Sequence, residues 1–250
     1  MSLKDEAIRI EGLTIRFRDL TAVDGLDLTV GKGELFGLLG PNGAGKTTTI
    51  KVLCGLLKPE SGLVRVGGHD VAHEMGKVKQ MIGVCPQEMG IFPFLTGREN
   101  VELFGDLAGV PKGELKERVD GLLERMSLSQ DAGRKVKDYS GGMKRRISLI
   151  MALVGEPSIS FLDEPTTGMD PQSRRAVWDF IRGLKEKGMT IVLTTHYMEE
   201  AEYLCDRVGI IDHGRIIALD PPKALMERYG AKDLEEVFLQ LTGKKIREAA

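Results

Sequence analysis

The sequence predicts an α/β fold in which helices cover both faces of a mostly parallel β-sheet. Short and nearly continuous apolar runs, which are typical of strands buried on both faces, alternate along the chain with stretches of helical periodicity. One of these runs leads directly into a glycine-rich loop, and a helical stretch follows that loop. A glycine loop between a strand and a helix is suited to an anion, so we expect the functional site there.

Length and composition are those of a globular protein. The chain has 250 residues, of which 42% are hydrophobic and 29% charged, and no low-complexity linker divides it, so we expect 1–250 to form a single domain. A formal net charge of −2 leaves no basic excess for nucleic acid. The widely spaced Cys54, Cys85 and Cys205 form neither a zinc motif nor a disulfide framework, which favours a reducing cytosol. No apolar run is long enough to span a bilayer or to act as a signal peptide.

The N-terminal third alternates between β-like runs and turns. The run before the glycine loop, Leu35–Leu39, is apolar throughout and indicates a buried strand. After the loop, helical spacing extends from Thr48 to Leu57 and ends near Pro59. Further strands are expected at Ile8–Ile10, Leu13–Phe17 and Leu26–Val30, and as a pair around Gly62–Val66 and Ile82–Cys85.

A change to helical periodicity marks the middle of the chain. It begins near Thr96 and continues to Met126, and it indicates an inserted helical subdomain at approximately 88–150. A short extension is expected at approximately 215–250, with an amphipathic helix over 232–247. Strands are expected at Ile159–Leu162, Thr190–Thr194 and Val208–Ile211, and the apolar face of the last helix carries Leu234, Val237, Phe238 and Leu241.

The glycine loop has the residues that phosphate binding requires. It matches GxxxxGK[ST] at every position and consists of Gly40, Pro41, Asn42, Gly43, Ala44, Gly45, Lys46 and Thr47. Its glycines let backbone N–H groups converge on phosphate oxygens, and the following helix offers free N-terminal donors. We expect Lys46 to reach the β- and γ-phosphates, the Thr47 hydroxyl to bind Mg²⁺, and Thr48 to belong to the nucleotide site. A glycine turn with a chance lysine is the alternative, against which the flanking strand and helix argue.

Two carboxylates follow the buried strand Ile159–Leu162. Asp163 stands at the strand end, where a nucleotidase with such a phosphate loop needs an Asp to hold Mg²⁺. Glu164 beside it is suited to polarise the attacking water as a general base. A solvated strand end is the alternative for such a pair in isolation, and the phosphate loop upstream favours the catalytic interpretation.

A second helix start with glycines lies at Ser140. Ser140 suits an N-cap, Gly141 and Gly142 allow close approach, and an apolar helix face follows. This pattern predicts a second site for an anion, while an ordinary capped helix is the alternative. The three cations that come next, at 144–146, are interpreted as a solvated face rather than a nucleic-acid patch.

These motifs, in this order, resemble the nucleotide-binding domain of ABC transporters. The match extends from about Phe17 to His196 and includes the loop 40–47, Gln87, Ser140–Gly142, Asp163 with Glu164, Asp170 and His196. The resemblance implies the ABC ATPase fold, a P-loop NTPase core with an N-terminal antiparallel β subdomain and an inserted α-helical subdomain.

The resemblance also implies a role for each matching residue. Phe17 would stack on adenine, although the family more often has Tyr there. Gln87 would lie near Mg²⁺, as one of its ligands, and near the attacking water, and would link the site to the transmembrane partner. Glu164 would act as general base, and His196 would donate a hydrogen bond to the γ-phosphate. Asp170 would belong to the loop that communicates across a dimer.

A composite site follows from the same resemblance. Ser140–Gly142 would contact the ATP held by a second copy, so that two chains enclose two nucleotides head to tail with C2 symmetry. Met143 stands where Gln is usual and Tyr139 where Leu is usual, but neither change removes the serine or the glycines. With Gly168–Asp170, these variants look most like the branch that exports drugs, sodium or polysaccharides.

We therefore expect the ATP-hydrolysing subunit of an ABC exporter, held at the inner face of the cell membrane by a separate transmembrane permease subunit and active as an ATP-dependent homodimer. A soluble relative acting in translation or DNA repair is an alternative, but its usual second nucleotide domain or coiled-coil insertion is not evident. A small-molecule kinase leaves Ser140–Gly142 and His196 unexplained. The apolar stretch Glu88–Leu95 is the expected docking segment, and a buried core role is its alternative.

Overall fold

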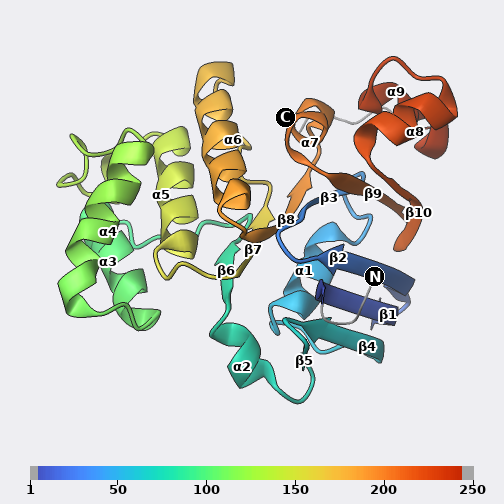
Figure 1. Cartoon of the computed structure of the whole chain (residues 1–250), viewed down its shortest axis with the longest axis horizontal. Coiled ribbons are helices and arrows are strands. Elements are labelled where there is room, and N and C mark those ends of the chain that lie inside the picture. Colours follow the sequence, from blue (N-terminus) through green and yellow to red (C-terminus); the bar gives the residue numbers. More distant parts are fainter. Residues whose placement is uncertain (1–4, 244–250) are drawn as a thin grey trace.

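A six-stranded, mostly parallel sheet forms the centre of the computed structural model, which describes residues 5–243 (Figure 1). Its strand order is β10-β9-β3-β8-β7-β6, in which only β10 runs antiparallel to its neighbour. The predicted α/β fold is therefore confirmed. The strands are β3 (Leu35–Leu39), β6 (Ile82–Cys85), β7 (Ile159–Asp163), β8 (Thr190–Thr195), β9 (Arg207–Asp212) and β10 (Arg215–Asp220).

The apolar strands of this sheet serve two cores at once. Leu35 and Leu39 pack in the core on the helical side, whereas Phe36 and Leu38 face the core shared with the N-terminal sheet. Because side chains alternate across a strand, burial of both faces requires an apolar residue at almost every position. This two-sided burial explains why the strands appear in the sequence as unbroken apolar runs.

The N-terminal segment forms a separate antiparallel sheet with strand order β2-β1-β4-β5. The expected pairing of 62–66 with Ile82–Cys85 is wrong, because β4 pairs with β1 and β5 while β6 pairs with β7. Arg65 stays exposed between the buried Val64 and Val66, a pattern that fits a sheet covered on one face only. The strands are β1 (Glu6–Phe17), β2 (Leu20–Gly31), β4 (Ser61–Val66) and β5 (His69–Asp70).

Helix α1 (Lys46–Leu53) follows the glycine loop and ends four residues before the predicted Leu57. The chain turns at Gly55, which has a φ of +69° and lies against the next helix, α2 (Met75–Lys79). A Cβ at Gly55 would lie 2.3 Å from Sδ of Met75. A left-handed residue at this point ends the helix, and glycine adopts that conformation at little cost.

Three helices form a lobe beside the sheet, at the left in Figure 1. They are α3 (Gly97–Leu107), α4 (Lys112–Arg125) and α5 (Gly141–Leu153), so helical structure is present where the sequence predicts it. A reciprocal capping box between Thr96 and Glu99 begins α3. Helix α5 extends from this lobe to the sheet and packs against β6 and β7.

The remaining helices follow β7. They are α6 (Pro171–Glu186), α7 (Met198–Leu204), α8 (Pro222–Tyr229) and α9 (Leu234–Thr242). The segment expected as a C-terminal extension begins with β10, a strand of the central sheet. In α9 the predicted apolar face is confirmed by the burial of Leu234, Val237 and Phe238, while the end of the predicted helix lies outside the described residues. Across residues 5–243, none of the helices has both the length and the apolar character to span a membrane.

Candidate active site

The glycine loop connects β3 to α1, and two of its glycines are required by close backbone contacts. A Cβ at Gly40 would lie 2.3 Å from the carbonyl oxygen of Ile211. At Gly45, which has a φ of +108°, it would lie 2.5 Å from the carbonyl oxygen of Ala22. Gly43 has a φ of +82° but faces open space, so its surroundings leave room for a ligand. The sequence pattern thus reflects both packing and ligand access.

Lys46 is the cation of this loop. Its buried Nζ donates hydrogen bonds to the carbonyl oxygens of Gly40 at 2.6 Å and Pro41 at 3.1 Å. Desolvation lowers the pKa of Lys46, and the nearby charges of Glu164 and Asp163 oppose that shift. The ammonium therefore lies within reach of both the loop and the two carboxylates. In this position it is suited to exchange carbonyl oxygens for phosphate oxygens.

The start of α1 offers free donors to the same space. Gly45 is the N-cap residue and provides no side chain to cap the helix. The first N–H groups of α1 therefore have no side-chain partner, and a helix N-terminus of this kind attracts an anion. Thr47 and Thr48 stand half-buried in the first turn, where the sequence places them in the nucleotide site.

Asp163 ends β7 with its side chain buried. Its carboxylate accepts a hydrogen bond from the hydroxyl of Thr194, which lies opposite on the parallel strand β8. The hydroxyl of Thr194 in turn accepts a hydrogen bond from the backbone N–H of Glu164 at 3.1 Å. One threonine thereby holds both acidic residues at the carboxyl edge of the sheet.

Glu164 brings three of the predicted catalytic residues together. Its carboxylate lies 3.3 Å from Nδ1 of His196 and 3.5 Å from Nε2 of Gln87, and it accepts a hydrogen bond from the hydroxyl of Thr167 at 3.1 Å. The hydrogen bond to His196 is the main cause of a lowered pKa of Glu164, against which desolvation acts. The carboxylate is therefore ionised at neutral pH, which is the form that accepts a proton from water.

The backbone at Glu164 is strained. Its φ is +52°, in the left-handed region that costs a residue with a Cβ about 1–2 kcal/mol. Hydrogen bonds on both sides of the residue hold this conformation, including that from its N–H to the carbonyl oxygen of Thr194 at 3.0 Å. In this backbone conformation the carboxylate of Glu164 contacts Gln87 and His196.

The other predicted residues lie apart from this cluster. Ser140 caps α5 and accepts a hydrogen bond from the N–H of Met143 at 3.2 Å. Asp170 caps α6 and accepts one from the N–H of Ser173 at 2.9 Å. The Phe17 side chain, at the end of β1, is 47% exposed. Within residues 5–243, no hydrogen bond or ion pair joins Ser140–Gly142 to the phosphate loop.

Arg145 contradicts the interpretation of 144–146 as a solvated face. Its side chain is only 3% exposed, and its guanidinium donates to backbone carbonyls beside the acidic pair. Arg146 is half-buried and donates to the carbonyl oxygen of Met126 at 2.6 Å. The helical period could have indicated that Arg145 is buried. Arg145 lies three and four residues before the buried Ser148 and Leu149, and so on the same face of α5.

Glu200 is a second buried residue that the sequence analysis missed. It lies in α7 and accepts hydrogen bonds from the hydroxyl of Thr166 at 2.7 Å and from Nε1 of Trp178 at 2.8 Å. Burial raises the pKa of Glu200. This carboxyl group anchors the segment just after Glu164 to two helices, and nothing in the local sequence distinguishes it from its neighbours in the helix.

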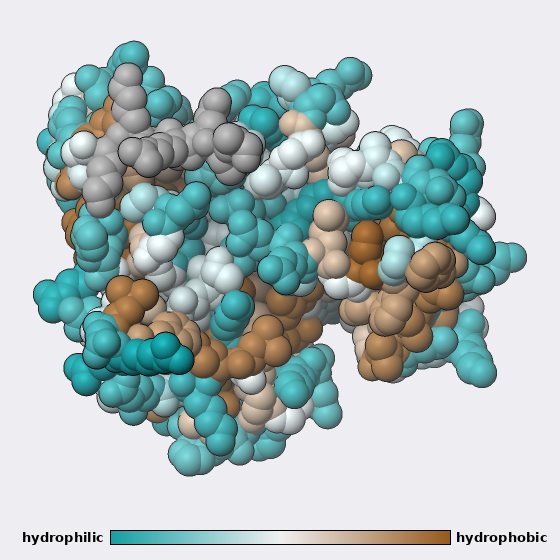
Figure 2. All heavy atoms as spheres, turned by 180° about the vertical axis from the view of Figure 1, so that it is seen from behind, coloured by the Kyte–Doolittle hydropathy of each residue, from teal (hydrophilic) through white to brown (hydrophobic). Residues whose placement is uncertain are grey.

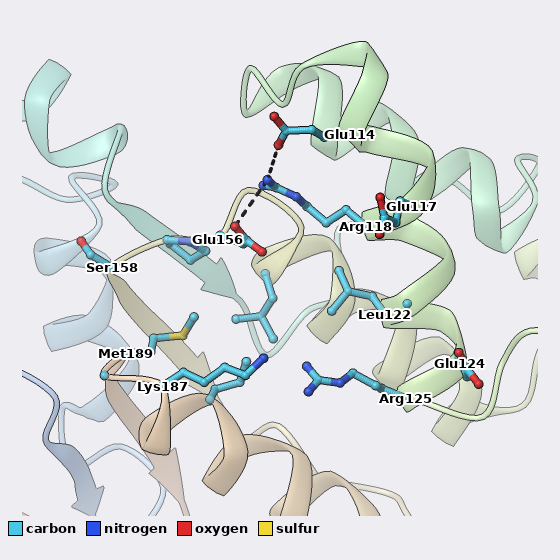
Figure 3. A pocket seen from close by; sticks show the side chains of 15 residues that line it. Glu114, Glu117, Arg118, Leu122, Glu124, Arg125, Glu156, Ser158, Lys187 and Met189 are labelled. Carbon is cyan, nitrogen blue, oxygen red and sulfur yellow. Dashed lines mark hydrogen bonds and ion pairs between the residues drawn. The ribbon is translucent and has the colours of Figure 1, made fainter.

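A cavity of about 830 Å³ lies elsewhere, between α4, the end of α5 and the turn from α6 to β8 (Figure 3). On one side of it Arg118 pairs with Glu114 at 2.8 Å and with Glu156 at 3.4 Å. None of the residues that the sequence assigns to the nucleotide site lines this cavity. The candidate site is therefore identified by its chemistry and not by the size of a pocket.

Comparison with protein families places most of the chain in a known group. The family described as ABC transporter matches residues 23–167. The linearmycin resistance ATP-binding protein LnrL of Bacillus subtilis is 44% identical over 242 residues, which cover 97% of this chain and 76% of that protein. The daunorubicin resistance ATP-binding protein DrrA3 of Streptomyces coeruleorubidus is 46% identical, with coverage of 94% and 75%. A Nod factor export ATP-binding protein I of Ralstonia nicotianae is 42% identical, with coverage of 92% and 72%.

Solved structures agree with this grouping. The ATP-binding subunit of an ABC transporter superimposes with a TM-score of 0.87 at 28% identity, over 94% of this chain and 99% of that chain. A dimeric ATP-binding cassette in a post-hydrolysis state, bound to ADP and phosphate, superimposes with a TM-score of 0.79 at 25% identity, over 86% and 98%.

Proposed function

Because the chain belongs to the ABC transporter family, as an ATP-binding subunit that hydrolyses ATP, we propose that it drives export through a separate transmembrane permease subunit. The observation that carries the hydrolytic part of this proposal is the contact of the ionised Glu164 with Gln87 and His196, beside the buried Lys46. These residues provide a base, two groups that orient it and a cation for phosphate. Together they are the parts that phosphoryl transfer to water requires.

In this proposal the phosphate loop holds the triphosphate of ATP. Lys46 and the N–H groups of the loop and of α1 bind the β- and γ-phosphate oxygens. Phe17, exposed at the end of β1, stacks on the adenine. Two hard oxygen donors, the hydroxyl of Thr47 and the carboxylate of Asp163, suit Mg²⁺ and would hold it, with Gln87 as a further ligand. When bound, Mg²⁺ neutralises charge on the phosphate oxygens.

Glu164 is the general base of the proposed hydrolysis. Its carboxylate accepts a hydrogen bond from the attacking water, whose oxygen forms a bond to the γ-phosphorus as the bond to the bridging oxygen of ADP breaks. His196 orients the carboxylate and is placed to donate to the γ-phosphate. The carboxylate of Glu164, ionised at neutral pH because its pKa is lowered mainly by the hydrogen bond to His196, also positions the water for attack.

The proposed active form is a head-to-tail dimer. Ser140–Gly142 begin α5 on the surface, without contact to the phosphate loop of the same chain, so their natural target is the ATP of a second copy. Asp170 would lie at the same interface. ATP then contributes contacts to both chains and favours the closed dimer, and loss of the γ-phosphate contact favours reopening.

The apolar stretch 88–95 is the proposed docking segment for the permease. Its Phe92 and Phe94 are 48% and 73% exposed, which argues against the core role that was the alternative. Figure 2 shows that apolar side chains gather on the lobe formed by α3, α4 and α5. The segment 88–95 leads into α3, the first helix of this lobe. Docking there would hold the chain at the inner face of the membrane. The lobe would correspond to the helical subdomain at approximately 88–150, with approximately 215–250 as the extension.

An export role is supported by the names of three relatives. Those proteins are described as ATP-binding proteins of linearmycin resistance, daunorubicin resistance and Nod factor export. We extend to this chain an energy-supplying role in export, which is named for the third relative and consistent with resistance in the other two. The cargo itself would be selected by the permease.

The dimer is tested with Glu164→Gln, which keeps the shape of the side chain but removes the base. We expect this variant to bind Mg-ATP, to lose hydrolysis and to accumulate as a dimer in size-exclusion chromatography with light scattering. Lys46→Ala, which weakens ATP binding, is the control and should remain monomeric. A Glu164→Gln variant that stays monomeric at saturating Mg-ATP would contradict the proposed dimer.

A further inference from the structure

One buried guanidinium links the two segments that carry the catalytic residues. Arg145 lies in the second turn of α5 and has five N–H donors, the full number for arginine. All five are used, and every acceptor is a backbone carbonyl oxygen. Nη1 donates to Pro86 at 2.6 Å and Gln87 at 3.2 Å, Nη2 to Asp163 and to Glu164 at 2.7 Å, and Nε to Pro165 at 3.3 Å.

No carboxylate neutralises this charge. Among the ion pairs of residues 5–243, none involves Arg145, so its charge is balanced by the dipoles of the five carbonyls. Burial of a charged group costs several kcal/mol unless hydrogen bonds offset it, and an apolar side chain of similar volume would fill the same space at less cost. An arginine here therefore points to a requirement for directed hydrogen bonds.

The carbonyls it binds are those that set the geometry of the base. The peptide groups before and after the Cα of Glu164 both bind Nη2, and the first of them also donates its N–H to Thr194. These contacts hold Glu164 at its φ of +52°. On the other side, Nη1 binds the carbonyl of Gln87, whose amide contacts the Glu164 carboxylate at 3.5 Å.

We propose that Arg145 is a positioning residue for ATP hydrolysis, which holds the backbones of Glu164 and Gln87 where their side chains meet the attacking water. Because Arg145 belongs to the helix that Ser140 caps, it also ties the position of that helix to the position of the base. The inference rests on the proposed function, since it takes Glu164 as the general base.

The test is the steady-state kinetics of Arg145→Ala. We expect kcat to fall about 100-fold, the effect of a displacement of a catalytic group by roughly 1 Å, while KM for ATP changes less than about threefold. The double variant Arg145→Ala, Glu164→Gln should still dimerise with Mg-ATP, because the phosphate loop and Ser140 are untouched. A residue needed only for folding would not separate kcat from KM in this way.

Chemical rescue distinguishes positioning from general stability. Millimolar guanidinium ion supplies the missing planar donors, so it should restore part of the kcat of Arg145→Ala, whereas ammonium ion should not. Arg145→Lys, with three donors on one atom, should recover only a part of the rate. Arg146→Gln is the matched control. It changes the next residue of α5, which binds the carbonyl of Met126 and none of the five carbonyls above, so its kcat should stay near that of the unmodified protein.

Several outcomes would overturn the inference. One is a folded Arg145→Ala protein whose kcat lies within threefold of the unmodified protein. If the alanine variant does not fold, Arg145→Lys and Arg145→Gln take its place under the same criterion, and failure of all three to fold would assign Arg145 to stability alone. An active Glu164→Gln would contradict the base itself, whereas an active Arg145→Ala with an inactive Glu164→Gln contradicts only the role of Arg145.

Discussion

At the scale of single residues, the site depends on a few backbone conformations that side chains elsewhere support. Glu164 is held in the left-handed region, and its carboxylate thereby reaches His196 and Gln87. Gly45 is also left-handed, at a φ of +108°, and brings Lys46 back over the loop. The left-handed conformation therefore costs little stability at Gly45, which has no Cβ. At Glu164 the same conformation costs stability, and it occurs at a residue of the candidate site.

Gly45→Ala should damage both stability and nucleotide binding. The added Cβ meets the carbonyl oxygen of Ala22 at 2.5 Å in a backbone conformation that alanine disfavours, so we expect a loss of about 1–3 kcal/mol in the free energy of unfolding and weaker ATP binding. Urea unfolding and ATP titration measure the two effects. Gly121→Ala, in the interior of α4 with nothing near the added Cβ, is the control and should stabilise by about 0.5 kcal/mol. An unaffected Gly45→Ala protein would refute the steric argument.

The lowered pKa of Glu164 predicts a pH dependence of stability. A carboxylate whose pKa is lower in the folded state stabilises the protein above the unfolded value, close to 4.5, and this contribution is lost as the pH falls through the folded pKa. Below pH 4.5 the unmodified protein should therefore lose free energy of unfolding relative to Glu164→Gln. His196→Ala removes the main cause of the shift and should weaken this dependence. Urea unfolding from pH 7 to pH 3 measures it, and a pH-independent difference would contradict the assignment.

At the scale of elements, parallel strand pairing brings the proposed catalytic residues together. Asp163 and Thr194 are register partners on β7 and β8, and Gln87 and His196 follow the ends of β6 and β8. Because the carboxyl ends of parallel strands meet at one edge of a sheet, the three segments at the ends of β6, β7 and β8 converge there. Helix α5 then ties this edge to the lobe of α3 and α4.

The exposed segment before α3 should be needed for coupling but not for catalysis. We expect Phe94→Asp to fold normally and to retain basal ATPase activity, because the side chain is 73% exposed, but to lose co-purification with the permease and ATP-driven export. Leu107→Asp, at the end of α3 and 74% exposed, is the matched control and should retain both. Loss of folding in Phe94→Asp, or full export activity, would argue against the docking proposal.

At the scale of the whole molecule, one chain holds two proposed half-sites. The phosphate loop connects β3 to α1 at the edge of the sheet, whereas Ser140–Gly142 begin α5. In the part of the chain that the structure describes, no hydrogen bond or ion pair joins Ser140–Gly142 to the phosphate loop. Two copies related by a twofold axis would bring each half against its complement and create two identical sites.

Mixing two inactive variants tests this arrangement. Lys46→Ala removes the phosphate-binding cation, and Ser140→Arg blocks the opposite half-site, so neither variant alone should be active. In a mixed dimer one of the two sites receives both intact halves, so an equal mixture should recover about a quarter of the ATPase activity if sites act independently. Each variant mixed with buffer alone serves as the control. A mixture that stays inactive would contradict a site shared between chains.

By itself, the sequence determined the phosphate loop, the acidic strand end and the two-sided sheet, because these features are local in the chain and each has its own residue pattern. The placements of Asp163, Glu164 and Ser140 at a strand end and a helix start are confirmed for the same reason. The expected pair of 62–66 with Ile82–Cys85 was wrong, since strand pairing depends on residues far away along the chain.

Only the tertiary structure decided the role of Arg145. A cation next to two others in a helix has the local pattern of a solvated face, and its five acceptors come from segments near 86 and 163 that the chain order keeps apart. The same holds for the contact of Gln87, Glu164 and His196, which exists because β6, β7 and β8 lie side by side. A charge is buried among backbone carbonyls only when segments far apart in the sequence pack around it. A local residue pattern does not contain those long-range contacts.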